Sequence, residues 1–281
     1  MSASVIDGKK IAQEIQEEVR EQVTHLNTRP GLAVLLVGNN PASELYVSLK
    51  QKAARKAGID VHLYRFEENA PEEEVLKALD WLNKDSEVHA ILVQLPLPEH
   101  LKTETIIRAI DPKKDVDGFH PENVKGILEN KNRLTPGLSL GILQLILACG
   151  IELPGKKIAI VGKSPAFTAV LKHVLEAYET QVSIVAPDED AHRTTREADV
   201  LVVAAGKPRW ITDRDIKENA IIIDVGTNTL SDGETIGDVD FESCAHKASW
   251  ITPVPGGVGP MTVAMLLKNT ILLAQEQSHT V

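Results

Sequence analysis

Short aliphatic runs alternate with helical patterns along most of this 281-residue chain. The runs end in glycine, proline or polar residues, and they predict strands at 32–37, 60–66, 88–94, 157–161, 181–185, 200–204 and 220–225. The patterns between them predict helices at 41–57, 71–83, 104–109, 167–178 and 261–275. Strands separated by helices imply crossover connections and a parallel sheet. Because aromatic residues make up only 4% of the chain, we expect an α/β protein with an aliphatic core.

A pause in the series of strands predicts two domains. Residues 111–155 hold polar loops, two helical segments and the turn-forming sequence Leu153-Pro-Gly155. We expect an α/β domain at residues 1–118 and a Rossmann-like, dinucleotide-binding domain with a parallel sheet at 119–255. The last helix, within residues 256–281, is expected to join the first domain.

Composition argues against several classes of function. The formal net charge is -10 and no basic cluster occurs, so no nucleic-acid partner is expected. Cys149 and Cys244 lie far apart and the nine histidines show no paired ligand spacing, so we expect no metal. The N-terminal segment is charged, and the most apolar stretch, 138–151, is too short to cross a bilayer. A cytoplasmic protein with no membrane partner is therefore expected.

The predicted helix at 41–57 carries candidate chemistry. Asn40 and Pro41 form a typical helix start, and Gly58 is a helix stop. One row of side chains is apolar and is expected to face the core; it consists of Ala42, Leu45, Leu49 and Ala53. A neighbouring row consists of Ser43, Tyr46 and Lys50. From spacing alone, Tyr46 and Lys50 are better interpreted as ordinary boundary residues, with the lysine reaching into water.

Two further segments place polar groups after predicted strands. Gln94 ends the strand at 88–94 and is followed by Leu95-Pro-Leu-Pro98, so its amide lies at a rigid sheet edge. The loop Asp111-Pro-Lys-Lys-Asp-Val-Asp-Gly118 places Asp115 and Asp117 beside a tight turn. A carboxylate there could bind a ring edge that carries adjacent N–H donors. Each segment alone is equally compatible with ordinary turn chemistry.

Four motifs in order carry a family resemblance. They are Asn40-Pro-Ala-Ser-Glu-Leu-Tyr-Val-Ser-Leu-Lys50, Val93-Gln-Leu-Pro-Leu-Pro98, Lys114-Asp-Val-Asp-Gly118 and Pro253-Val-Pro-Gly-Gly-Val-Gly-Pro-Met-Thr262. Over essentially its whole length the chain resembles the bifunctional methylenetetrahydrofolate dehydrogenase/methenyltetrahydrofolate cyclohydrolase family. The resemblance implies NAD(P)-dependent oxidation of 5,10-methylenetetrahydrofolate, followed by hydrolysis of the methenyl product to 10-formyltetrahydrofolate.

The resemblance also implies roles for individual residues. Lys50 corresponds to the catalytic lysine of the family, with Gln94 orienting its amine. Tyr46 would stack on the pterin or the adjoining ring, and Asp115 would hold the pterin N–H groups. The other residues implied to contact the folate are Ser43, Leu95, Pro255, Gly256 and Gly259.

The nucleotide half departs from the family pattern. The implied cofactor-binding residues are Gly162, Lys163, Ser164, Thr168 and Thr227. Thr168 stands where a second glycine is usual, so phosphate binding is expected to be altered, although its hydroxyl could bond a phosphate. NADP is the default cofactor of the family, but the acidic run Pro187-Asp-Glu-Asp190 favours the ribose of NAD.

Three functions remain open from the sequence. The chain is a bifunctional enzyme, a cyclohydrolase with a degenerate nucleotide site, or a folate-binding protein without catalysis. The resemblance further implies a homodimer formed through the nucleotide domain.

Overall fold

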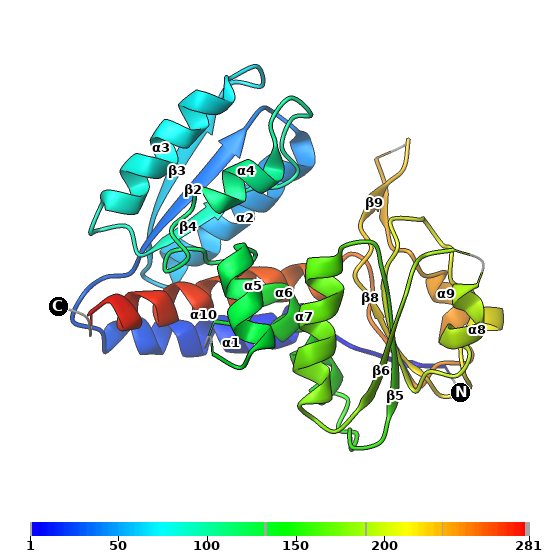
Figure 1. Ribbon diagram of the computed structural model, residues 1–281. Coiled ribbons are helices and arrows are strands. Elements are labelled where there is room, and N and C mark those ends of the chain that lie inside the picture. The colour runs from blue at the N-terminus through cyan, green and yellow to red at the C-terminus, as the bar shows by residue number, and fades with distance from the viewer. Residues whose placement is uncertain (1, 132–133, 189, 232, 279–281) are drawn as a thin grey trace. The chain divides into compact units, whose positions relative to one another are not determined.

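The computed structural model describes residues 2–131, 134–188, 190–231 and 233–278 and divides the chain into two compact units (Figure 1). The six-stranded unit comprises Met1–Ala12 and Leu138–Thr262, and the three-stranded unit comprises Gln13–Gly137 and Val263–Val281. These bounds differ from the predicted domains. The first residues join the six-stranded unit because β1 (Ser4–Val5) pairs with β11 (Trp250–Ile251). Residues 119–137 stay with the three-stranded unit.

The three-stranded unit is built on a parallel sheet with the strand order β3-β2-β4. Its strands are β2 (Gly31–Val37), β3 (Asp60–Phe66) and β4 (Ala90–Val93). The connecting helices are α2 (Pro41–Lys56) and α3 (Glu72–Lys84), followed by α4 (Thr103–Arg108) and α5 (Pro121–Leu128). All seven residues of β2 are buried, as expected for a central parallel strand covered on both faces.

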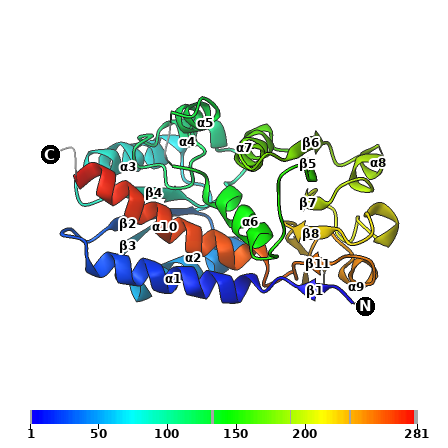
Figure 2. The same cartoon turned by 90° about the horizontal axis from the view of Figure 1, so that it is seen from below.

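Side chains alternate across this sheet and divide its core into two layers. Ala33, Leu35 and Val37 pack against α3 and α4 on one face. The reversal of direction after β3 places α2 on the other face, because parallel crossovers are right-handed. Residues 13–24 of α1 (Gly8–Thr24) and residues 263–278 of α10 (Val258–Ser278) run side by side in both views (Figures 1 and 2).

The six-stranded unit has a parallel sheet with the order β1-β11-β8-β7-β5-β6. Its longer strands are β5 (Lys157–Gly162), β6 (Gln181–Val185), β7 (Val200–Ala204) and β8 (Ile221–Asp224). Its remaining elements are α6 (Gly137–Leu147, from residue 138), α7 (Pro165–Glu176), α8 (Ala191–Thr195), η1 (Asp213–Asp215), β9 (Asn228–Thr229), β10 (Thr235–Ile236) and α9 (Phe241–Ala245). The chain crosses from β6 to β7 on opposite sides of β5, which makes the carboxyl end of β5 a topological switch point. This arrangement confirms the predicted α/β class with a Rossmann-like unit.

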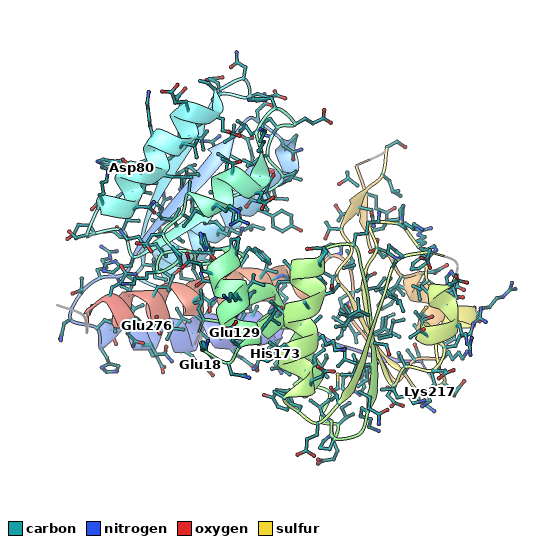
Figure 3. The ribbon with its side chains drawn as sticks, viewed as in Figure 1. Glu18, Asp80, Glu129, His173, Lys217 and Glu276 are labelled. Atoms are coloured by element: carbon teal, nitrogen blue, oxygen red, sulfur yellow. The ribbon has the colours of Figure 1, made fainter. Side chains whose placement is uncertain are left out.

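Several acidic side chains lie on the surface of the three-stranded unit. Glu18, Asp80, Glu129 and Glu276 are all exposed (Figure 3). Within the described ranges, no helix is long and apolar enough to cross a membrane.

Candidate active site and nucleotide loops

Helix α2 positions Lys50 close to the carboxyl ends of β2 and β4. The Asn40 Oδ1 atom accepts hydrogen bonds from the N–H groups of Ala42 (3.0 Å) and Ser43 (3.1 Å), so the predicted cap is present. Pro41 is the first helical residue, where its missing N–H has no cost. Three turns on, the helix presents Lys50 as a half-buried side chain.

The predicted core-facing row of α2 is wrong. Leu45 and Leu49 are 60% and 45% exposed, whereas Ser43, Val47 and Ala54 are buried. The two rows lie next to each other on the helix. Packing of α2 against the sheet buries Ser43 at the start of the second row, although the first row is more hydrophobic. This rotation of α2 brings the Lys50 flank towards the sheet.

Gln94 holds the Lys50 amine. Lys50 Nζ donates to Gln94 Oε1 at 2.9 Å, and Gln94 Nε2 donates to the Leu95 carbonyl at 2.6 Å. The Gln94 backbone N–H donates to Leu35 O at 2.9 Å, which continues the pairing of β4 with β2 beyond Val93. Because its NH₂ group is engaged by Leu95, the buried amide directs its oxygen at the lysine.

Asp115 is held by hydrogen bonds within its own loop. Its side chain is 1% exposed and accepts from the N–H groups of Gly118 (3.2 Å) and His120 (2.7 Å) and from Asn123 Nδ2 (3.0 Å). Both carboxylate oxygens are therefore engaged in folding the loop into α5.

Asp117 is the carboxylate whose charge acts on Lys50. Burial raises the pKa of Asp117 from 3.8 to about 6, while the Lys50 charge lowers it and Asp115 raises it further. Burial lowers the pKa of Lys50 from 10.5, and the Asp117 charge opposes that shift. The sequence placed both aspartates in one loop, and the choice between them required the hydrogen bonds of Asp115.

The pairing of these groups suits proton transfer. A neutral lysine amine that donates to Gln94 keeps a lone pair that can accept a proton. A lowered pKa makes this neutral form available closer to neutral pH than an ordinary lysine allows. Lys50, Gln94 and Asp117 thus form a candidate acid–base site at one end of the three-stranded sheet.

The other predicted folate contacts fall in both units. Ser43 is buried, Tyr46 is half-buried one turn before Lys50, and Leu95 is 38% exposed; all three belong to the three-stranded unit. Pro255, Gly256 and Gly259 belong to the six-stranded unit. There, Gly256 has a φ of +115°, a conformation that favours glycine.

The turn from β5 to α7 is tight. A Cβ atom on Gly162 would lie 2.9 Å from Thr168 Cγ2, so the turn has no room for a side chain. Ser164 caps α7, with its Oγ accepting from the N–H of Phe167 at 3.4 Å. Lys163 and Ser164 are exposed beside this helix start. The predicted role of the Thr168 hydroxyl is not supported, because the side chain is buried and donates to Ser164 O at 3.1 Å.

Two buried aspartates organise the loops after β7 and β8. Asp238 accepts from the N–H groups of Ala205 (2.6 Å), Gly206 (2.9 Å) and Lys207 (2.8 Å). Asp224, at the end of β8, accepts from the N–H groups of three residues, which are Gly226, Asp238 and Val239. Burial raises the pKa of Asp224 to about 7. Neither aspartate was among the predicted site residues, and only their buried N–H partners identify them.

The remaining predicted cofactor residues lie on exposed loops. Thr227 follows β8 and is exposed, as are Asp188 and Asp190 after β6. Glu189 lies outside the described residues. In the part of the chain that the structure describes, no group of three or more His, Cys, Asp or Glu side chains could hold a metal ion.

Comparison with known families matches both halves of the chain. A model described as the catalytic domain of tetrahydrofolate dehydrogenase/cyclohydrolase matches residues 6–117, and one described as its NAD(P)-binding domain matches residues 136–278. The "Bifunctional protein FolD" of Moorella thermoacetica is 46% identical, covering 98% of this chain and 100% of the relative. That of Acetivibrio thermocellus is 44% identical, covering 99% of each.

Solved structures agree. The bifunctional FolD methylenetetrahydrofolate dehydrogenase/cyclohydrolase of Campylobacter jejuni superposes with a TM-score of 0.93 at 41% identity, covering 98% of this chain and 99% of that one. The Trypanosoma brucei methylenetetrahydrofolate dehydrogenase-cyclohydrolase, solved with NADP cofactor and an inhibitor, has a TM-score of 0.93 at 33% identity, covering 99% of each chain. With both domain models and whole-length relatives in agreement, this chain belongs to the tetrahydrofolate dehydrogenase/cyclohydrolase family.

Proposed function

We propose that this protein oxidises 5,10-methylenetetrahydrofolate with NAD(P) and hydrolyses the methenyl product to 10-formyltetrahydrofolate. The observation that carries the proposal is the 2.9 Å hydrogen bond from Lys50 Nζ to Gln94 Oε1, on a lysine that also feels the charge of Asp117. Relatives along the whole chain bear the name of the bifunctional enzyme, which supports the same assignment.

Hydrolysis requires a base at the methenyl carbon. Neutral Lys50 accepts a proton from water as the water oxygen bonds to that carbon. N5 then takes the proton that the lysine returns, and the C–N5 bond breaks as the added hydroxyl loses its remaining proton to solvent. The carbon stays on N10 as a formyl group. A cationic methenyl substrate near Lys50 adds repulsion against its protonated form, which further favours the base.

Oxidation removes a hydride from the methylene carbon, and a bound nicotinamide supplies the acceptor. The backbone of the six-stranded unit has a turn that suits a bound dinucleotide. β5 ends at Gly162, where the turn leaves no space for a Cβ, and α7 then begins with its N-terminus at the carboxyl end of the sheet. The NAD(P)-binding model matches this same segment.

One observation favours a second candidate, a cyclohydrolase with an impaired nucleotide site. Thr168 stands in the first turns of α7, and its methyl group occupies the space beside Gly162. Its hydroxyl is turned back onto the Ser164 carbonyl, away from a phosphate. The hydrolytic site depends on none of these residues.

Assays of the purified protein separate the candidates. Hydrolysis of methenyltetrahydrofolate and oxidation of methylenetetrahydrofolate, with NAD and NADP tested separately, are both expected. Hydrolysis without oxidation would select the cyclohydrolase alone. Folate binding with neither reaction would select a non-catalytic protein.

A further inference from the structure

The loops after β6 and β7 meet at the carboxyl end of the six-stranded sheet. β6 and β7 pair with β5 on its two sides, and β6 is the strand that follows the Gly162 turn and α7. In dinucleotide-binding folds, the end of that second strand lies beside the adenosine ribose. Side chains there discriminate the 2′-hydroxyl of NAD from the 2′-phosphate of NADP.

Lys207, from the loop after β7, extends to the loop after β6. Its Nζ donates to the carbonyl of Pro187 at 2.6 Å and lies 4.9 Å from the centre of the Trp210 ring. The Trp210 ring also lies against His192 of α8, with ring centres 4.7 Å apart. The ammonium is thus held at the end of β6 by a neutral carbonyl and an aromatic face.

The backbone of Lys207 is also fixed. Its N–H, together with those of Ala205 and Gly206, donates to the fully buried carboxylate of Asp238. A lysine on a backbone held by three charge-assisted hydrogen bonds reaches a restricted set of positions. The fixed backbone therefore keeps the Lys207 side chain close to the carboxyl end of β6.

We propose that Lys207 is the residue that binds the ribose 2′-phosphate of NADP in this protein. The inference rests on the proposed dehydrogenase function. An ammonium whose partners are a carbonyl and a ring can exchange them for a phosphate oxygen, which forms a stronger, charge-assisted bond. Lys207 thereby opposes Asp188 and Asp190, whose exposed carboxylates on the adjoining loop disfavour that phosphate.

The test measures nucleotide binding, which needs no turnover. Adenosine 2′,5′-bisphosphate and adenosine 5′-monophosphate are titrated calorimetrically into the full-length protein and into Lys207→Met. The wild type should bind the bisphosphate more tightly, and Lys207→Met should lower that preference about tenfold or more. Lys207→Arg, which retains a cation, should keep most of the preference.

Lys247→Met is the matched control. Lys247 Nζ also donates to a backbone carbonyl, that of Asp213 at 2.8 Å, but Lys247 lies by the amino ends of β8 and β11. This variant should bind both nucleotides as the wild type does. Thermal unfolding within a few degrees of wild type would show that Lys207→Met is folded.

Two results would overturn the inference. One is an equal loss of affinity for both nucleotides in Lys207→Met, and the other is a wild-type protein that does not prefer the bisphosphate. In either case, if the protein oxidises methylenetetrahydrofolate with NAD, the proposed dehydrogenase function still holds. If instead the protein oxidises no methylenetetrahydrofolate but still prefers the bisphosphate through Lys207, the dehydrogenase function is rejected and the nucleotide-binding role of Lys207 is retained.

Discussion

The surroundings of Lys50 distinguish it from the other lysines of α2. Lys52 is exposed, two positions along the same helix, whereas Lys50 is half-buried and bonded to Gln94. Burial lowers the pKa of Lys50, so more of this side chain is a neutral amine, able to accept a proton, near neutral pH. The difference arises from which flank of the helix meets the sheet.

Replacement of Lys50 tests its role as the base. Lys50→Met keeps an unbranched side chain of similar reach but removes the amine. Methenyltetrahydrofolate hydrolysis should fall by roughly a hundredfold or more, because general-base catalysis is lost. Lys52→Met should retain wild-type hydrolysis, and circular dichroism should show both variants folded. Full activity of Lys50→Met would disprove the assignment.

The pH profile of hydrolysis should report the Lys50–Asp117 pair. Hydrolysis needs neutral Lys50, so activity rises with pH through a lysine pKa below 10.5. The ionised Asp117 raises that pKa, and Asp117→Asn removes the charge. The rising limb of kcat/KM against pH should therefore move to lower pH in Asp117→Asn. An unchanged or higher inflection would contradict the interaction of Asp117 with Lys50. Glu44→Gln is the control: it removes a carboxylate of α2 that pairs with Arg65, and the inflection should stay at its wild-type pH.

The hydrogen bonds of Asp115 make a separate prediction about stability. Asp115→Asn turns one of its acceptor oxygens into an NH₂ group that faces N–H donors from Gly118, His120 or Asn123. The free energy of unfolding in urea at pH 7.5 should fall by about 1–3 kcal/mol.

Asp117→Asn is the comparison for this measurement. The pKa of Asp117 is raised to about 6, so any stability from its protonated form is lost as pH rises through that value. At pH 7.5 its replacement should therefore leave stability unchanged or raise it. The opposite ranking of the two variants would restore Asp115 as the functional carboxylate.

At the scale of elements, the β5–α7 turn brings positions 162 and 168 into contact. A Cβ on Gly162 meets Thr168 Cγ2, a branch of a buried and rotationally stiff side chain. A larger side chain at position 162 can therefore be accommodated only if the side chain at position 168 becomes smaller.

A double-mutant cycle measures that coupling. Gly162→Ala should lower the free energy of unfolding by about 1–3 kcal/mol through overpacking. In a Thr168→Ser background, which keeps the hydroxyl but lacks Cγ2, the same change should be at least 0.5 kcal/mol less harmful, as a rough threshold for coupling. Additive effects would show that the turn relaxes elsewhere.

At the scale of the whole molecule, the six-stranded sheet ends in two unlike edges. β6 is a five-residue edge strand on which Ile184 is 41% exposed, and β1, at the other edge, has only two residues, with Val5 52% exposed. A long exposed edge favours pairing with another chain. The homodimer that the family resemblance implies is therefore expected to form through β6.

Sedimentation tests this proposal. The wild type should sediment at twice the chain mass of 30.6 kDa. Ile184→Lys should shift the equilibrium towards single chains, because a charged residue on an edge strand opposes pairing. Val5→Lys, at the opposite edge, should leave the dimer unaffected. A monomeric wild type, or a dimer insensitive to Ile184→Lys, would contradict the proposal.

The amino-acid sequence by itself determined the class of fold and the positions of its principal strands. The predicted bounds of β3, β6 and β7 coincide with the observed ones, and β4 differs by two residues at its start and one at its end. These features follow from periodicity and turn residues, which are local properties of the chain. Lys50 and Gln94 were likewise found from motifs, and the structure brings them together.

Only the tertiary structure decided which groups meet. It selected the Ser43–Lys50 flank of α2 over the more apolar row, and it assigned Asp115 to the loop and Asp117 to Lys50. It also paired residues 4–5 with the six-stranded sheet and connected Lys207 to Pro187. Residues far apart in sequence are joined by crossovers and buried hydrogen bonds, and local pattern carries no information about such pairs.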